Sequence, residues 1–200
     1  MTQQSTTLMA AIWPAEGRAA WLRAVLLAIA GSLLLTLSAK IQVPFWPVPM
    51  TMQTYVVMVI GAAFGWRLGG ATVLLYLAEG AMGLPVFANT PERGLGLAYM
   101  VGPTGGYLIG FLVAAVAIGW LAERGWDRSL WRMVVAMALG HAVVFAFGVP
   151  YLAALVGWES AIALGLTPFI AGSLLKTALA GATLPVAWTL LGGRRGGTVR

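Results

Sequence analysis

The sequence contains no cysteine and only one histidine, His141. Without thiols there can be no disulfide bonds, thiolate metal sites or cysteine nucleophiles. A single imidazole also argues against a histidine-based metal site or a catalytic triad. We therefore expect no metal, no cofactor and no enzymatic activity.

Charge is also scarce, because only 9% of the 200 residues are charged while 60% are hydrophobic. Soluble domains carry roughly 25% charged residues. The composition therefore predicts an all-α integral membrane protein. The net charge of +6 does not indicate nucleic-acid binding, since the basic residues lie singly or in small groups beside apolar segments, a pattern that orients a protein in a bilayer.

Six apolar segments have the character of transmembrane helices, for which about 20 residues cover ~30 Å of hydrocarbon. We expect these helices at 19–38, 50–65, 68–81, 106–122, 130–147 and 168–191. They form a membrane domain of residues 19–192, between a polar N-terminal segment (1–18) and a basic cytoplasmic tail (193–200).

Three details of this assignment depend on single residues. Only Trp66 and Arg67 separate the second and third helices, and Gly148 and Pro150 are expected to end the fifth. The first segment also has features of a secretory signal peptide, but everything after it is membrane-spanning, so we interpret it as a helix that stays in the protein.

Six crossings place both termini on one side of the membrane. Nine basic residues lie on that side and two, Lys40 and Arg93, on the other. The nine are Arg18, Arg23, Arg67, Arg124, Arg128, Arg132, Arg194, Arg195 and Arg200. The positive-inside rule then predicts cytoplasmic termini in a multi-pass membrane protein. The long connections 40–49, 82–105 and 148–167 are expected on the outer face, where they form a binding pocket.

Lys176 is the one basic residue expected deep inside a helix. An ammonium group there costs about 2.5–3.5 kcal/mol and normally faces a cavity or a partner. Ser173 lies one turn earlier on the same face. The Ser-x-x-Lys spacing matches a serine acyltransferase motif, but no second motif supports it, so an intramembrane enzyme using Ser173 and Lys176 is only an alternative. Glu79 is either an interfacial charge or a counter-ion for Lys176.

Two further groups of residues are candidates for binding. Asn89 and Arg93 lie in a polar run between apolar stretches and are either solvated or part of a pocket mouth. Ala20, Ala24 and Ala28 form a stripe of small residues that lets another helix approach closely. That stripe fits a partner protein and internal packing equally well on spacing alone.

The motifs between residues 43 and 111 resemble those of a known family. They are Val43-Pro44, Val48-Pro49-Met50-Thr51-Met52-Gln53, Tyr76-Leu77 to Gly80, Gly83-Leu84-Pro85-Val86-Phe87-Ala88 and Gly102-Pro103-Thr104-Gly105-Gly106-Tyr107-Leu108-Ile109-Gly110-Phe111. These stretches closely resemble the BioY family, the biotin-specific substrate-capture (S) components of energy-coupling-factor (ECF) transporters. The likeness extends over about 170 residues, from the first helix to the last.

The resemblance implies a multi-pass protein of the prokaryotic cell (inner) membrane that captures biotin from the outer side and transfers it inward, surrounded by membrane lipid. Members of the family usually work with a transmembrane coupling protein and ABC-type ATPases. This chain has no Walker A sequence of its own. The alanine stripe resembles the face with which S components dock on the coupling protein. Whether the chain works alone, as a homo-oligomer or only with those subunits stays open, and a carrier of another small vitamin is the main alternative.

The family also suggests roles for individual residues. Trp46 and Tyr99 are candidates for packing against the biotin rings, and Asn89 and Gln53 for hydrogen bonds to the ureido edge. Lys176 or Arg93 would meet the carboxylate, and which of them does so is open. Where the family commonly has Asp on the last helix, this chain has Ser173, so we expect Glu79 or the ligand carboxylate to neutralise Lys176.

Overall fold

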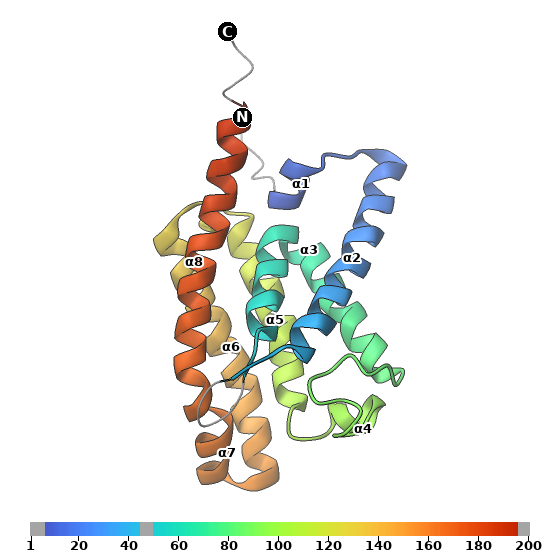
Figure 1. The fold of residues 1–200 in the computed structure, drawn as a ribbon, viewed down its shortest axis with the longest axis vertical. Coiled ribbons are helices and arrows are strands. Elements are labelled where there is room, and N and C mark those ends of the chain that lie inside the picture. Colours follow the sequence, from blue (N-terminus) through green and yellow to red (C-terminus); the bar gives the residue numbers. More distant parts are fainter. Residues whose placement is uncertain (1–6, 45–49, 196–200) are drawn as a thin grey trace.

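Long apolar runs form long helices in the computed structural model, which describes residues 7–44 and 50–195 (Figure 1). The helices are α1 (Leu8–Ile12), α2 (Gly17–Lys40), α3 (Gln53–Ala81), α4 (Gly96–Met100), α5 (Gly105–Ala122), the 3₁₀ turn η1 (Trp126–Arg128), α6 (Leu130–Val156), α7 (Trp158–Gly165) and α8 (Thr167–Arg195). Two short strands, β1 (Gln42–Val43) and β2 (Met50–Thr51), pair antiparallel between α2 and α3. The loop expected at 40–49 is therefore bounded by a short ladder.

Five described helical stretches are long and apolar enough to cross a bilayer, namely α2, α3, α5, α6 and Trp158–Leu191. The expected helical membrane architecture is confirmed at this level.

The two short helices expected around Trp66 and Arg67 are the two halves of α3. The chain leaves helical geometry at Gly65, whose φ of 84° and ψ of 171° favour glycine. Beyond this turn the halves run antiparallel, because the Gln53 side-chain amide reaches the Tyr76 hydroxyl 23 residues later, at 2.7 Å. The break lies one residue before the expected position.

The expected end of the fifth helix is wrong. The helix continues to Val156 with Pro150 inside it, because a proline is tolerated in a membrane helix when neighbouring helices supply packing and hydrogen bonds. Here Val149, Leu152 and Ala153 form a small apolar cluster with Ala161 of α7. Packing with α7 thus overrides the local signal from Gly148 and Pro150.

Both segments that flank the expected membrane domain contain helix in the part of the chain that is described. Within the N-terminal segment, α1 buries Leu8, which is 5% exposed, in the main core. At the other end, α8 continues to Arg195, into the expected tail.

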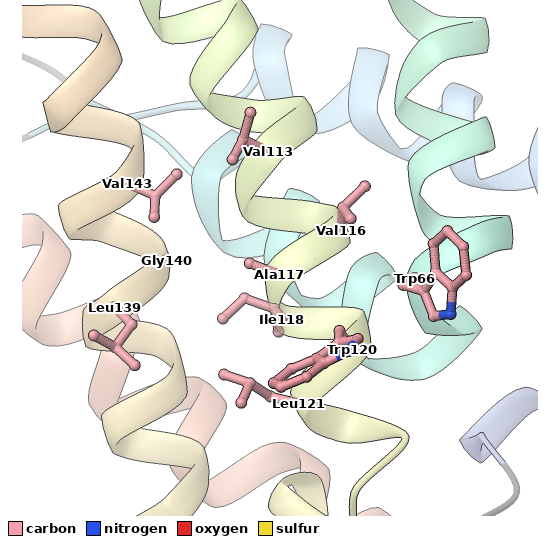
Figure 2. A pocket seen from close by; sticks show the side chains of 10 residues that line it. All are labelled: Trp66, Val113, Val116, Ala117, Ile118, Trp120, Leu121, Leu139, Gly140 and Val143. Atoms are coloured by element: carbon pink, nitrogen blue, oxygen red, sulfur yellow. The ribbon is translucent and has the colours of Figure 1, made fainter.

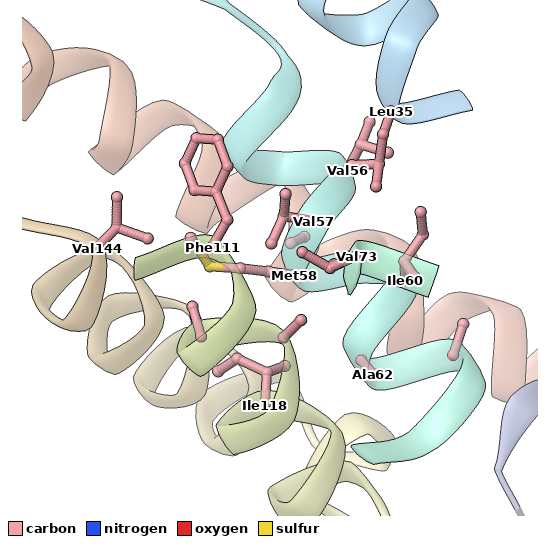
Figure 3. Packing of buried hydrophobic residues seen from close by; sticks show 14 of the residues in the cluster. Leu35, Val56, Val57, Met58, Ile60, Ala62, Val73, Phe111, Ile118 and Val144 are labelled. Carbon is pink, nitrogen blue, oxygen red and sulfur yellow. The ribbon is translucent and has the colours of Figure 1, made fainter. Parts of the chain in front are cut away.

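The main core forms where α3, α5 and α6 meet, and side chains such as Val57, Met58, Phe111, Ile118 and Val144 point into it (Figure 3). Helix α2 joins this core only through its second half. Its buried residues are Gly31, Ser32, Leu35, Ser38 and Ala39.

The bundle has two distinct ends (Figure 1). At the terminal end lie α1, the turn at Gly65, η1 and the last turn of α8. At the loop end lie α4, α7, the strands β1 and β2 and the connection between α3 and α5. The described parts of the three long connections therefore share one end of the molecule.

Candidate functional site

An aromatic and amide network organises the loop end. The Gln53 amide donates to the Tyr76 hydroxyl at 2.7 Å, and that hydroxyl donates to the Val86 carbonyl at 3.0 Å. The Tyr99 hydroxyl donates to the Ala88 carbonyl at 2.9 Å. Both predicted site residues in this network, Gln53 and Tyr99, are under 10% exposed. The structure thus places them where they hold the 86–88 segment in position.

Phe87 lies at the centre of this network. Its ring stacks on Tyr99, with centroids 4.9 Å apart, and meets Tyr76 edge-on at 5.3 Å. A Cβ on Gly80 would lie 2.0 Å from the Phe87 ring, so the glycine leaves the space that the ring fills. The motifs around 80 and 87 are therefore two halves of one packing arrangement.

Two side chains that sequence reasoning did not assign to the site, Lys40 at the end of α2 and Gln42 of β1, bind the 89–90 turn. The Lys40 ammonium donates to the Thr90 carbonyl at 2.6 Å and to its hydroxyl at 2.8 Å. The Gln42 amide donates to the Asn89 side-chain oxygen at 2.7 Å. The predicted site residue Asn89 is thus joined to β1, while Arg93 is exposed. The only local signal was the position of Lys40 at the end of its helix.

Lys176 is buried inside the bundle, with 6% of its surface exposed. Its ammonium donates to the Thr54 hydroxyl at the start of α3, at 2.9 Å. Its neighbour Thr177 lies 3.3 Å from His141 Nδ1, which also contacts the Met137 carbonyl at 3.0 Å. Three helices therefore contribute polar groups around this cation.

Glu79 lies elsewhere in the bundle and accepts a hydrogen bond from Ser32 of α2. Across residues 7–44 and 50–195, no ion pair joins it to Lys176, so the expected counter-ion pairing is not formed. Ser173 is half-buried one turn before Lys176. Trp46 lies outside the described residues. Ala20, Ala24 and Ala28 are half-buried on the part of α2 that precedes its buried residues.

Neither of two open grooves on the surface of the described chain is lined by Lys176, Asn89 or Tyr99. The larger, of about 800 Å³, lies between α5 and α6 beside Trp66 (Figure 2). The smaller, of about 370 Å³, lies between α6 and α8 and includes Thr177. We locate the candidate site from its chemistry, at Lys176 and the loop end, because the larger groove is lined only by apolar side chains and tryptophans.

Comparison with known proteins gives consistent matches. The model of the BioY family matches residues 4–193. A probable biotin transporter of Pyrococcus horikoshii is 37% identical over 147 residues, covering 74% of this chain and 85% of the relative. A biotin transporter of Thermotoga maritima is 38% identical over 148 residues, with the same coverage.

A solved structure has the same fold. The crystal structure of the S-component for biotin from an ECF-type ABC transporter superposes with a TM-score of 0.69, covering 88% of this chain and 95% of the other. Because the two sequences are only 22% identical, this match shows the fold alone. The family resemblance of the glycine and proline motifs is confirmed by the family match and the curated relatives, and the chain belongs to the BioY family.

Proposed function

We propose that the protein captures biotin at the loop end and delivers it inward as the membrane component of a vitamin transporter. The relatives that share 37–38% of its residues are named as biotin transporters. The structural observation that carries the proposal is Lys176, a buried cation whose hydrogen-bond partner is a neutral hydroxyl. A buried charge needs a partner, and a ligand carboxylate supplies one.

The chemistry of biotin fits the surroundings of Lys176. Biotin combines an apolar bicyclic ring and chain with a ureido group and one carboxylate. Such ligands bind in mostly apolar sites with a few fixed polar groups. In this proposal Lys176 meets the carboxylate, and Thr54 holds the ammonium in position beforehand. Arg93 is the competing cation, and its exposure makes it the weaker candidate because water screens an exposed charge.

The proposed orientation places the loop end outside and the terminal end in the cytoplasm. The two halves of α3 then count as separate crossings, which gives six. Arg67 follows the turn at Gly65, Arg124 follows α5 and Arg128 belongs to η1, so all three belong to the terminal end, in agreement with the positive-inside rule. The three long connections would surround the ligand on the outer side.

The proposed partners are a transmembrane coupling protein and ABC-type ATPases. The solved structure of the same fold is titled as an S-component of an ECF-type ABC transporter. Ala20, Ala24 and Ala28 would form the docking face, because this part of α2 contributes no buried residue to the bundle.

Calorimetric titration of the purified protein with biotin and with biotin methyl ester tests the proposal. We expect the ester, whose carboxylate is masked, to bind at least tenfold more weakly, about 1.4 kcal/mol. Lys176→Ala should weaken biotin binding by a similar factor and remove the difference between the two ligands. Arg132→Ala, at the terminal end, is the control and should leave both affinities unchanged.

Three outcomes would overturn the proposal in different ways. Failure to bind biotin together with tight binding of another vitamin would assign a different cargo. Recovery of chemically altered biotin would indicate an enzyme that uses Ser173 and Lys176. Unchanged affinity in Lys176→Ala would move the carboxylate contact to another cation, which Arg93→Ala would then identify.

A further inference from the structure

The larger surface groove has a chemical character that biotin capture does not use. Its walls are aliphatic side chains of α5 and α6, among them Val113, Val116, Leu139 and Val143. It is open on the outside of the bundle, since Leu139 is 49% exposed. Its volume of about 800 Å³ is within the usual range of ligand sites, ~300–1,000 Å³.

Two tryptophans close the groove at the terminal end. Figure 2 shows Trp120 beside Leu121 at one end of the lining and Val113 and Val143 at the other. Trp66 reaches the same end from the turn in α3. Tryptophan rings are favoured at the level of the lipid headgroups. The groove thus runs from the headgroup level along the hydrocarbon-facing side of α5 and α6.

An arginine guanidinium lies over the ring of each of these two tryptophans. The Arg67 guanidinium lies 4.9 Å from the Trp66 ring centroid, and that of Arg124 lies 3.3 Å from the Trp120 centroid. Arg124 also donates one N–H to the Trp120 carbonyl at 2.9 Å. A guanidinium has five N–H donors in a fork that matches phosphate geometry, so donors remain for an anion.

The nearby carboxylate of Glu123 does not cancel this charge. Its Oε1 accepts the backbone N–H of Trp66 at 3.3 Å, which ties the end of α5 to the turn in α3. Two cations and one carboxylate leave the end of the groove with a net positive charge, next to a channel lined by aliphatic side chains and two tryptophans.

We propose that this groove binds an anionic glycerophospholipid, with an acyl chain between α5 and α6 and the phosphate between Arg67 and Arg124. Basic sites between transmembrane helices on the cytoplasmic side bind anionic headgroups. The charge at the headgroup level favours a lipid over a partner helix, which would have to bring its own carboxylates. The assignment to the cytoplasmic leaflet rests on the orientation proposed above, and the site itself does not.

Native mass spectrometry of the purified protein with equal amounts of phosphatidylglycerol and phosphatidylcholine, matched in acyl chains, tests the headgroup contact. The wild type should retain phosphatidylglycerol in at least tenfold excess. Arg67→Gln/Arg124→Gln should lose the preference. Arg18→Gln/Arg132→Gln, which removes the same charge from the same end of the bundle, should keep it. Equal retention of both lipids by the wild type, or equal loss in both variants, would overturn the proposal.

A second variant tests the acyl chain. Ala117 lines the groove, and Ala117→Trp should fill it and reduce phosphatidylglycerol retention severalfold. Glycerol phosphate, which has the headgroup charge without the chains, should not compete. If it competes fully, the arginines bind free phosphate and the groove plays no part. If Ala117→Trp instead blocks assembly with the coupling protein and leaves lipid retention unchanged, the groove is a protein interface.

Discussion

The two ends of the bundle use positive side chains in opposite ways. At the loop end Lys40 and Lys176 turn toward the protein and donate hydrogen bonds to Thr90 and Thr54. At the terminal end the guanidinium groups of Arg67 and Arg124 lie on exposed tryptophan rings. Positive charge is thus hydrogen-bonded to threonine oxygens at one end and stacked on tryptophan rings at the other.

This difference reflects what each end must bind. A buried ammonium is costly unless something compensates it, so its retention at the loop end points to a ligand. An arginine on a tryptophan face at the headgroup level keeps its charge near water and anionic lipid. In the functions proposed above, the buried Lys176 would meet the cargo, and Arg67 and Arg124 would meet the lipid of the membrane.

The comparison predicts that the loop end depends on close packing around Phe87. Gly80→Ala should lower the free energy of unfolding by about 3 kcal/mol, because the new Cβ overlaps the Phe87 ring and overpacking costs ~1–3 kcal/mol. Equilibrium unfolding in SDS, followed by tryptophan fluorescence, measures it.

Gly70→Ala is the matched control for this substitution. Its Cβ would meet only a Val116 methyl, at 2.9 Å, so we expect a loss below about 1 kcal/mol. If Gly80→Ala and Gly70→Ala lowered the free energy of unfolding equally, the overlap with the Phe87 ring would not determine the cost of the substitution.

The second prediction concerns the hydrogen bonds of the loop end. Tyr76→Phe leaves the Gln53 amide and the Val86 carbonyl without their common partner. Buried polar groups without a hydrogen-bond partner cost ~1–3 kcal/mol. We therefore expect Tyr76→Phe to lower the free energy of unfolding by about 2 kcal/mol in the same assay. Tyr151→Phe removes a single exposed bond to the Val101 carbonyl and should cost clearly less. A Tyr76 variant as stable as the Tyr151 variant would contradict the proposed network.

The third prediction concerns Asp127, a buried carboxyl group at the terminal end, and its expected effect on stability is the smallest of the three. The Trp188 indole donates to Asp127 at 2.5 Å. Burial raises the pKa of the Asp127 carboxyl, and the bond from Trp188 acts in the opposite direction. Trp188→Phe removes a hydrogen bond to an ionised group and should cost about 1.5 kcal/mol near neutral pH.

The stability lost in Trp188→Phe should also depend on pH, in a direction that follows from the pKa of Asp127. A carboxyl whose pKa is raised by folding contributes less stability as pH rises through that pKa. Trp188→Phe raises the pKa of Asp127 further, so the difference in unfolding free energy between variant and wild type should shrink as the pH falls through the raised pKa and the carboxyl becomes protonated. A difference independent of pH would show that the indole contributes only packing.

Much of the fold follows from local patterns in the sequence. The apolar runs predicted the ranges of α2, α5 and α8 closely, because length and hydropathy are local properties. The turn in α3 was expected near Trp66, and Gly65 provides it. The end of α6 was mispredicted, because packing between α6 and α7 decides whether the helix continues through Pro150.

The site was less predictable. Lys176 stood out from the sequence alone, since a charge inside an apolar helix is visible without knowing the fold. The partners Thr54, Thr90 and Ser32 were not, because each is joined to its cation or carboxylate across 47 to 122 residues of chain. Gln53 and Tyr99 were expected at the ligand, but sequence alone cannot distinguish a side chain that contacts cargo from one that supports the wall.

The uneven burial of α2 has a mechanical consequence. All its buried residues lie from Gly31 onward, and Lys40 fastens its end to Thr90. The first half of α2 contributes no buried residue, and besides the chain itself the Arg23 guanidinium ties it to the Trp13 carbonyl after α1, at 2.6 Å. A tilt of this half would therefore cost little internal packing, and it would pull on the 89–90 turn through the bond from Lys40.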